Sequence, residues 1–380
     1  MKHLCEDFGC TDHWYEADGY FTAGRPPWLA AALSTNSITT SGDSSATTAA
    51  ADPKQAAKLH AEHAYMAINH TDPKAVWLYQ GWILPGAAPF TEGLVAAVEP
   101  GRLVISDMRC EDANGCEWSD DYSHGGSFYG APFIFGTLHN FGGTLGMWGS
   151  LPQLTSAPLK ALCNATSMSG IGMLPEGIDQ NTPWSTFLMD TNWAAVGGHD
   201  VAPEQKLRCD VSADRQALID IPLWVSAWAM QRYGGGAGYD EAHQAWSLII
   251  NTVYGEIQGK HTDAQDQADA LTSYPVGAQQ EGVEPRAEWY DLSKIYDAWG
   301  LLVEVADKRA TEESSVHATA VMPNSLRYDV VNTGREVLAK LSNRLFNTTT
   351  AARSVSELAA AMGPMLEALA DADELVSVYY

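Results

Sequence analysis

The chain has 380 residues, and 46% of them are hydrophobic, including 13 Trp and 15 Tyr, so it is able to bury large cores. Its 47 acidic residues outnumber its 22 basic residues, which gives a formal charge of -25. Nucleic acid binding needs a basic stripe that the sequence lacks, so we exclude that class of partner. No run of about 18 apolar residues is present, so we expect no membrane span.

The cysteines are six in number, and two pairs of them lie close in sequence. In chain order they are Cys5 and Cys10, Cys110 and Cys116, then Cys163 and Cys209. Their spacings do not match zinc motifs, so we expect neither a metal nor another cofactor. We favour disulfides in an oxidising compartment, with free structural thiols as the alternative. Three N-glycosylation sequons, at Asn69, Asn164 and Asn347, agree with that compartment but also arise by chance.

The first fifth of the chain reads as irregular apart from one helix. Residues 13–28 are dense in aromatic and acidic side chains without helical periodicity, so we expect the end of a strand followed by a loop. Residues 34–51 are almost all small or polar, which predicts a flexible insertion. Asp52 and Pro53 then open a helix that extends to about Asn69.

Short apolar runs alternate with connections of a helix's length between residues 75 and 176. The runs are 75–80, 102–106, 132–138 and 167–172, and a helix is expected at 91–98. This alternation predicts parallel β/α units. Polar or aromatic residues follow each run, namely Trp82, Asp107, His139 with Asn140, and Glu176. In a β/α barrel the carboxyl ends of the strands build the active site, so this placement predicts a sugar-binding mouth.

Glu176 lies in a constrained turn between Pro175 and Gly177. Proline fixes its own φ and glycine permits a positive φ, so the carboxylate is aimed in a definite direction. Such an aimed carboxylate suits a nucleophile. The alternative from these residues alone is an ordinary turn with a solvated Glu.

From about residue 183 the sequence has the spacing of long helices. We expect them at 218–233, 239–254, 292–308, 325–346 and 354–380, with Asp291 and Asn324 among the capping residues. His261 and Tyr290 fall in the connections between these helices. Residues of that type can lean over a neighbouring site, and packing on a helix end is the alternative. The sequence thus predicts a separate all-α domain.

Five segments together resemble α-N-acetylglucosaminidases, glycoside hydrolase family 89. They are residues 75–82 (AVWLYQGW), 127–134 (SFYGAPFI), 138–143 (LHNFGG), 172–178 (GMLPEGI) and 327–329 (RYD). The resemblance implies a lysosomal or secreted retaining exo-hydrolase that removes terminal α-linked N-acetylglucosamine, as at the ends of heparan sulfate. It also implies a catalytic (β/α) barrel followed by an all-α domain whose residues help to line the pocket.

Position by position, the resemblance makes Glu176 the nucleophile. It places the substrate-binding pocket at residues that match the family's segments or lie beside them: Trp82, Asp107, Met108, His139, Asn140, His261 and Tyr290. The glycan with its terminal α-linked N-acetylglucosamine is then the expected partner, and the formation of a homo-oligomer stays open.

One departure from the family concerns the acid/base residue. The family has D-T-F-N-E followed by P-P, whereas this chain has residues 18–27 (DGYFTAGRPP), so the Asn-Glu pair is absent. Glycoside hydrolysis by two carboxylates needs both an acid and a nucleophile. Asp18 or Glu16 could substitute for the missing acid if the loop repositions them. The rival interpretation is a catalytically silent homologue that binds N-acetylglucosaminyl glycan ends.

A second departure is length, because only about four strands of an eight-stranded barrel can be counted. We therefore expect residues 1–182 to form an incomplete (β/α) barrel and residues 183–380 an α-helical domain, in a chain that is part of a longer gene product. No apolar segment follows the first five residues, so no signal peptide is visible. In an oxidising compartment, Cys110 and Cys116 should be bridged and should steady the pocket rim after Asp107.

Overall fold

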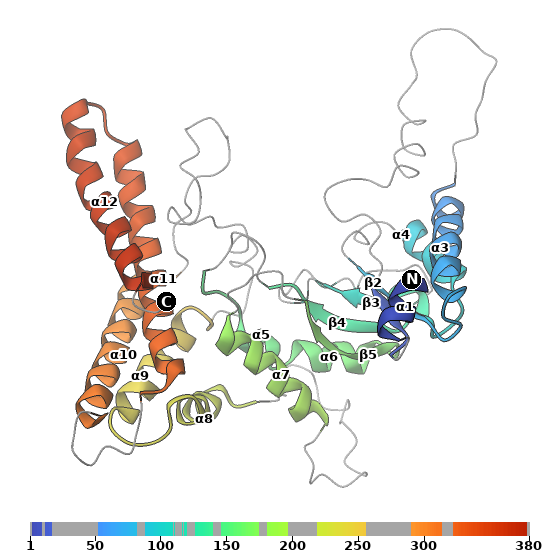
Figure 1. Cartoon of the computed structure of the whole chain (residues 1–380), viewed down its shortest axis with the longest axis horizontal. Coiled ribbons are helices and arrows are strands. Elements are labelled where there is room, and N and C mark those ends of the chain that lie inside the picture. The colour runs from blue at the N-terminus through green and yellow to red at the C-terminus, as the bar shows by residue number, and fades with distance from the viewer. Residues whose placement is uncertain are drawn as a thin grey trace. The chain divides into compact units, whose positions relative to one another are not determined.

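The computed structural model of the chain describes residues 2–9, 12–16, 52–81, 88–108, 110, 116, 118–119, 126–139, 146–174, 181–196, 219–255, 290–313 and 322–377. It divides into two compact units. One contains residues 1–138 and 157–174, and the other contains residues 139–156 and 175–380. The first unit holds a parallel sheet with helices, and the second is helical (Figure 1).

In the described part of the chain the sheet has five strands, all parallel and in sequence order. They are β1 (Trp14–Glu16), β2 (Val76–Gln80), β3 (Leu103–Asp107), β4 (Phe133–Thr137) and β5 (Met168–Met173). The predicted β/α units are therefore confirmed, with one strand more among these residues than the four or so counted from the sequence. The additional strand is β1, which was expected only as the end of a strand because its three residues show little periodicity. Because the strands are parallel, their carboxyl ends share one edge.

Two helices that pack together cover this sheet. They are α3 (Pro53–Asn69), which confirms the predicted helix, and α4 (Ala88–Ala97). The Asp52 carboxylate caps α3 by accepting the Lys54 N–H at 3.1 Å. Gly93 permits the close approach of the helices, because a Cβ there would lie 2.2 Å from the Lys54 carbonyl oxygen. Trp77 and Phe133 are buried in the core between helices and sheet.

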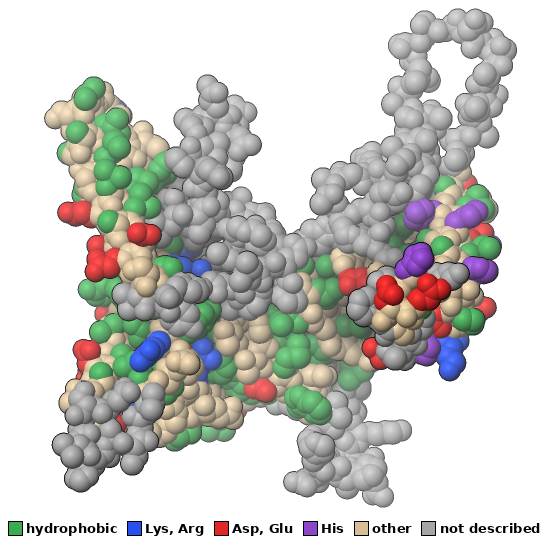
Figure 2. Space-filling model, in the orientation of Figure 1, with side chains coloured by type: hydrophobic (Ala, Val, Ile, Leu, Met, Phe, Trp, Pro, Cys, Tyr) green, Lys and Arg blue, Asp and Glu red, His purple; other side chains and the backbone are tan. Residues whose placement is uncertain are grey.

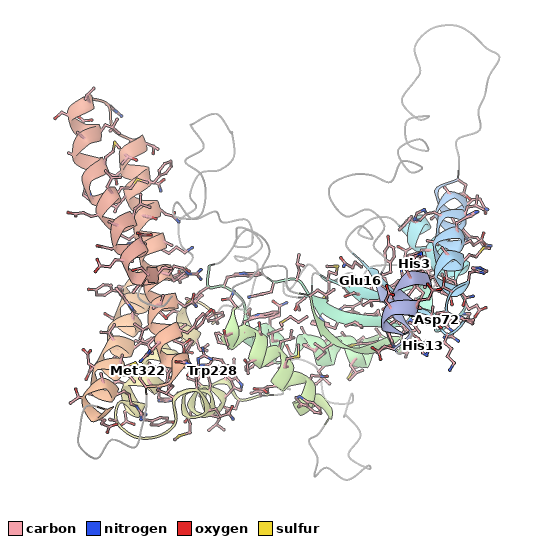
Figure 3. All side chains as sticks on the ribbon, in the orientation of Figure 1. His3, His13, Glu16, Asp72, Trp228 and Met322 are labelled. Atoms are coloured by element: carbon pink, nitrogen blue, oxygen red, sulfur yellow. A yellow bond between two sulfur atoms is a disulfide. The ribbon has the colours of Figure 1, made fainter. Side chains whose placement is uncertain are left out.

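An acid-base cluster lies at the opposite, amino-terminal edge of the sheet (Figure 3). The buried Asp72 Oδ2 accepts the Tyr15 hydroxyl at 2.8 Å and lies 2.7 Å from His13 Nδ1. Burial by itself would raise the pKa of Asp72, but the hydrogen bonds from His13 and Tyr15 outweigh it and the pKa is lowered. This cluster ties the start of β1 to the turn that precedes β2.

Short helices complete the first unit and the start of the second. They are α1 (Lys2–Phe8), the 3-10 helix η1 (Ser127–Gly130), α5 (Leu151–Leu154) and α6 (Ala157–Asn164). The connection between β4 and β5, which the sequence shows to be of a helix's length, contains α5 and α6. The helix α1 was not predicted from the sequence.

Among the described residues, six longer helices build the second unit. They are α7 (Thr182–Val196), α8 (Ile221–Tyr233), α9 (Tyr239–Thr252), α10 (Leu292–Glu313), α11 (Asn324–Thr350) and α12 (Val355–Ser377). The predicted helical character after about residue 183 is confirmed. Asp291 caps α10 by accepting the Ser293 N–H at 3.0 Å. The expected cap at Asn324 was wrong, because Pro323 takes the cap position and makes no side-chain bond there.

A buried charge network joins α8, α9 and α11. Arg232 donates from Nε and Nη2 to Asp329, the second bond measuring 2.7 Å, and Tyr233 donates its hydroxyl to the same carboxylate. Trp246 donates in turn to the Tyr233 hydroxyl at 2.8 Å. The two-nitrogen contact of Arg with a carboxylate is among the stronger polar interactions in proteins. Asp329, in the segment 327–329 that resembles the family, thus has a structural partner.

Figure 2 shows hydrophobic side chains at the surface over α11 and α12. On α12 the exposed ones are Val355, Leu358, Met362 and Leu366. Among the described residues, no helix combines the length and apolar character that crossing a bilayer requires.

Candidate active site

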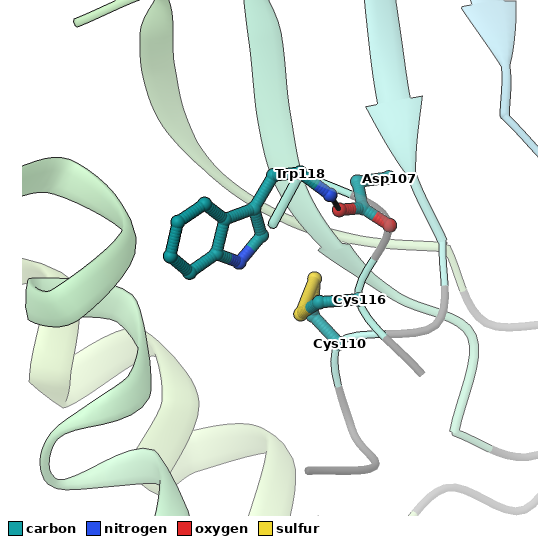
Figure 4. Close-up of a disulfide and its surroundings, with 4 residues drawn as sticks. All are labelled: Asp107, Cys110, Cys116 and Trp118. Atoms are coloured by element: carbon teal, nitrogen blue, oxygen red, sulfur yellow. Dashed lines mark hydrogen bonds between the residues drawn. A yellow bond between two sulfur atoms is a disulfide. The ribbon is translucent and has the colours of Figure 1, made fainter. Parts of the chain in front are cut away.

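Asp107, at the carboxyl end of β3, is one of the predicted substrate-binding residues. Its side chain is fully buried, and Oδ2 accepts the Trp118 N–H at 2.9 Å (Figure 4). Met108 follows, is also buried, and accepts the Leu138 N–H on its backbone oxygen at 3.0 Å. The chain after β3 is therefore fixed both to Trp118 and to the chain after β4.

The predicted Cys110–Cys116 disulfide is confirmed, with 4.5 Å between the Cα atoms. Cys110 is buried, and its N–H donates to the Gly136 carbonyl in β4 at 3.0 Å. Figure 4 shows the bridge beside Asp107. The two sulfurs and the Asp107 carboxylate lie within 4.8 Å of one another. They do not form a metal site, because bridged sulfurs are not thiolate ligands. Cys5 and Cys163 are also disulfide-bonded, to partners outside the described residues.

The backbone is closely packed where β3 and β4 end. A Cβ on Gly136 would lie 2.7 Å from the Asp107 carbonyl oxygen and 2.8 Å from Ser106 Oγ, so a larger residue would push the two strands apart. The hydroxyls of Ser106 and Thr137 are buried at this edge and have no hydrogen-bond partner in the part of the chain that the structure describes.

His139 belongs to the second unit and lies between two tryptophan rings. Its ring centroid is 4.2 Å from that of Trp148 and 3.8 Å from that of Trp184, with interplanar angles of 12° and 9°. Burial lowers the pKa of His139 well below its ordinary value, against a smaller opposing effect of the Trp148 backbone. The imidazole is therefore neutral, and neither nitrogen reaches a described partner with good hydrogen-bond geometry.

The stack around His139 depends on Gly149. This glycine has φ +131°, and a Cβ on it would lie 2.2 Å from Trp184 Cδ1 and 3.1 Å from His139 Cε1. His139 itself has φ +57°, in the left-handed region. Both ring faces of His139 are covered by tryptophan, so this buried side chain does not present a ring face to a ligand.

The segment 146–151 is held by side chains and backbone of the helical unit. Asn181 Nδ2 donates to the Gly146 oxygen at 3.2 Å, and the Met147 N–H donates to Glu336 Oε2 at 3.0 Å. The Leu151 N–H donates to the Tyr254 oxygen at 3.0 Å. This segment therefore has a fixed conformation, and the contacts come from separate parts of the helical unit.

Tyr290, whose contact with the substrate stays a prediction, donates its hydroxyl to Glu336 Oε1 at 2.8 Å. Glu336 lies 3.6 Å from Lys340 Nζ, and both side chains are buried. Tyr254 donates its hydroxyl to Asn181 Oδ1 at 2.7 Å, and burial raises the pKa of Tyr254 well above its ordinary value, with the Glu336 charge adding to the effect. The tyrosines thus serve as donors to buried oxygens.

The remaining predicted residues lie outside the described part of the chain. They are the nucleophile Glu176, the acid/base substitute Asp18, and the pocket residues Trp82, Asn140 and His261. Their roles stay predictions. Glu16, the other acid/base substitute, ends β1 at the carboxyl edge of the sheet, is exposed, and accepts a hydrogen bond from Gln80 Nε2.

Sequence reasoning did not identify Glu336, Lys340, Asn181 or Tyr254. The spacing of Glu336 and Lys340 is i,i+4, which ordinarily indicates a surface ion pair on a helix. Both residues are instead at most 3% exposed. A signal was nevertheless present, because Val337 and Leu338 beside Glu336 are apolar.

Comparisons with known proteins give consistent relatives for both units. Residues 1–195 match the family described as "Alpha-N-acetylglucosaminidase (NAGLU) tim-barrel domain", and residues 224–379 match "Alpha-N-acetylglucosaminidase (NAGLU) C-terminal domain". Human alpha-N-acetylglucosaminidase is 28% identical over 369 residues, which cover 94% of this chain and 40% of that protein. The chain thus spans about two fifths of the length of this curated relative.

Solved structures of a family 89 glycoside hydrolase from Clostridium perfringens have a similar fold. Its complex with 2-acetamido-1,2-dideoxynojirmycin gives a TM-score of 0.65 at 20% identity, and covers 96% of this chain and 34% of that one. Its complex with the substrate GlcNAc-alpha-1,4-galactose gives a TM-score of 0.63, also at 20% identity and with the same coverage. At this identity the likeness concerns the fold.

Proposed function

We propose a function from the premise that this chain belongs to the alpha-N-acetylglucosaminidase family, to which its residues 1–195 and 224–379 match. The proposed function is that of a glycoside hydrolase that removes terminal α-linked N-acetylglucosamine from glycans. The observation that carries the proposal is the family match over both units. The parallel sheet supports it, because its carboxyl edge holds Asp107 and Met108 where a barrel enzyme places its site.

The proposed mechanism is retaining. Glu176 attacks the anomeric carbon, the glycosidic oxygen leaves, and water then releases the sugar from the glycosyl-enzyme. The acid that protonates the leaving group is a substitute for the family's absent glutamate. Glu16 and Asp18 are the two candidates, and the exposed position of Glu16 at the carboxyl edge of β1 favours it.

The proposed substrate class is a glycan with a terminal α-linked N-acetylglucosamine, such as the end of heparan sulfate. The related bacterial enzyme was solved with GlcNAc-alpha-1,4-galactose, which supports this class. We place the protein in the lysosome or outside the cell. The bonded cysteines Cys5, Cys110, Cys116 and Cys163 support an oxidising compartment. We also retain residues 1–182 and 183–380 as the proposed domains.

A second candidate is a silent homologue that binds N-acetylglucosaminyl ends without cleaving them. The observation that favours it is the departure at residues 18–25, where the family's Asn-Glu pair is replaced. The two candidates make the same prediction for ligand binding and opposite predictions for turnover.

The experiment that tests the proposal uses 4-nitrophenyl α-N-acetylglucosaminide with the whole chain. Nitrophenolate leaves without protonation, so a competent Glu176 releases it even with a weakened acid. Glu176→Ala should abolish this release, and Glu16→Gln should slow only substrates whose leaving group needs a proton. Calorimetric binding of N-acetylglucosamine with no release of nitrophenolate would overturn the hydrolase assignment and select the silent homologue.

A further inference from the structure

Two chain segments that carry predicted site residues end at positions that are bonded to each other. The described chain resumes at residue 146 after the segment that contains Asn140, and at residue 181 after the segment that contains Glu176. Asn181 Nδ2 donates to the Gly146 oxygen at 3.2 Å. The Asn181 side chain is buried. Gly146 and Asn181, the first described residues after these two segments, are therefore hydrogen-bonded to each other.

Glu336 fixes the residue that follows Gly146. Its Oε2 accepts the Met147 N–H at 3.0 Å, and its Oε1 accepts the Tyr290 hydroxyl at 2.8 Å. Both carboxylate oxygens are thus occupied by donors, in a place that excludes water. A carboxylate that accepts from two donors in such a place is a strong and directional acceptor.

Asn181 is oriented by the same part of the helical unit. Tyr254 donates its hydroxyl to Asn181 Oδ1 at 2.7 Å, and its backbone oxygen accepts the Leu151 N–H at 3.0 Å. The amide of Asn181 is therefore used at both ends, once towards Tyr254 and once towards Gly146. Tyr254, Asn181 and Glu336 together hold the segment 146–151 at three backbone positions.

A buried charge of this kind is not explained by stability. Replacing a buried ion pair with apolar residues of similar volume is often neutral or stabilising, so a gain in stability does not by itself account for Glu336 and Lys340. The two donors that Glu336 accepts from, Met147 and Tyr290, come from separate parts of the chain, so the carboxylate holds those parts in a definite arrangement. Catalysis requires such an arrangement, since a displacement of 1 Å can cost about 100-fold in rate.

We infer that Glu336 is a positioning residue for glycoside hydrolysis: with Asn181 it fixes the chain directly after the segments that carry Asn140 and Glu176, through its bonds to Met147 and Tyr290. This role rests on the proposed function. Glu336 touches no substrate and acts through the backbone of Met147. Tyr290, which the sequence assigned to the pocket, supports Glu336 in this role.

The test compares Glu336→Leu, which removes both acceptors, with a matched control, Glu304→Leu. Glu304 forms the same i,i+4 pair with Lys308 on α10, at 2.7 Å, but on the surface. A third variant, Glu336→Gln, keeps an acceptor for the Met147 N–H and can donate its NH2 group to the Tyr290 oxygen, because a hydroxyl also accepts. For Glu336→Leu we expect kcat on 4-nitrophenyl α-N-acetylglucosaminide to fall about 10- to 100-fold, with KM changed less than about threefold, and no change in the control.

Hydrogen exchange supplies a readout that does not depend on activity. In Glu336→Leu the Met147 amide should exchange at least about tenfold faster, while the Leu151 amide, bonded to Tyr254, keeps its rate. Glu336→Gln keeps an acceptor for the Met147 N–H, so it should recover part of the lost kcat and of the Met147 protection.

Three outcomes would overturn the inference. Unchanged Met147 exchange would show that Glu336 does not hold this segment. Faster Met147 exchange with unchanged kcat would show that the segment does not position the site. Equal acceleration at Met147 and Leu151, with no recovery in Glu336→Gln, would reveal general destabilisation. If the parent chain releases no nitrophenolate, the proposed function fails and the role in hydrolysis fails with it, while Met147 exchange in Glu336→Leu still shows whether Glu336 holds the segment.

Discussion

The Cys110–Cys116 bridge gives a prediction whose magnitude follows from its size. The two cysteines are 6 positions apart, and closing a ring of that size removes unfolded-state entropy worth about 2 kcal/mol in the chain-entropy picture. Beyond this general stabilisation, the bridge holds Trp118 against Asp107, through a bond of 2.9 Å to a buried carboxylate. The double variant Cys110→Ala, Cys116→Ala should therefore lower the stability of the sheet unit by about 2 kcal/mol, and the Trp118 amide should lose more protection from exchange than the amides of the sheet.

Native-state hydrogen exchange resolves these effects residue by residue. Ile105 in β3 donates its N–H to the Pro132 oxygen at 2.9 Å, so its amide reports on the sheet, and the Trp118 amide reports on the loop. Val253, which donates to the Ile249 oxygen at 2.9 Å, is the reference in the helical unit and should keep its rate. We expect about 30-fold faster exchange at Ile105, which is the rate equivalent of about 2 kcal/mol.

A matched control separates the crosslink from the loss of sulfur atoms. With reductant present in both samples, the disulfides of Cys5 and Cys163 are reduced alike and the parent chain also lacks the bridge, so its Ile105 and Trp118 amides should approach the rates of the alanine variant under the same conditions. If the Trp118 amide exchanges equally slowly in the variant and in the oxidised parent, the bridge does not hold Trp118 on Asp107. The reasoning about the pocket rim would then be refuted.

Three further predictions concern single residues. Gly149→Ala would place a methyl group 2.2 Å from Trp184 at a φ of +131°, so urea unfolding should show a loss of more than about 3 kcal/mol in the stability of the helical unit. A loss below roughly 0.5 kcal/mol, the size of a neutral surface change, would contradict the close packing. Because the pKa of His139 is lowered in the fold, its contribution to the free energy of unfolding is complete above its unfolded pKa of about 6.5 and is lost as the pH falls below that value, by at most about 1.4 kcal/mol per pH unit. In His139→Phe the free energy of unfolding should therefore depend less on pH between about pH 7 and 5.5. An unchanged pH dependence would exclude His139 as its source. The pKa of Asp72 is lowered as well, so its contribution to stability is complete above its unfolded pKa of about 4 and is lost as the pH falls through its folded pKa. In thermal melts, the Tm of Asp72→Asn should therefore fall less in acid than that of the parent. An equal fall of Tm with pH in parent and variant would argue against this role.

The fold was largely predictable because the central strands β3 and β4 are buried at nearly every position. Such strands appear in the sequence as continuous apolar runs, and 75–80, 102–106 and 132–138 correspond to β2, β3 and β4 within a residue or two. The strand β1 was recognised only as a strand end because its three residues carry no period. The helices after residue 183 were predictable from apolar spacing, since their inner faces pack on one another.

The contacts of the candidate site were less predictable because they depend on partners far apart in sequence. His139 was expected beside a sugar, yet Trp148 and Trp184 cover both faces of its ring. Glu336 and Lys340 have the spacing of a surface pair but are buried, since Tyr290 and the Met147 backbone approach Glu336 from other parts of the chain. Glu176 itself lies outside the described residues, and its role was inferred from its turn and from the family resemblance.

The measurement that tests the central claim most directly is the identification of the product formed in the presence of azide. The chain is incubated with 4-nitrophenyl α-N-acetylglucosaminide and azide, and the product is analysed by proton NMR. Azide needs no general base, so it should accelerate turnover and give the α-glycosyl azide, because two inversions restore the starting configuration. Glu176→Ala should form none of this product. A β-glycosyl azide from the parent chain, or an α-glycosyl azide from Glu176→Ala at the parent rate, would contradict Glu176 as the nucleophile of a retaining hydrolase.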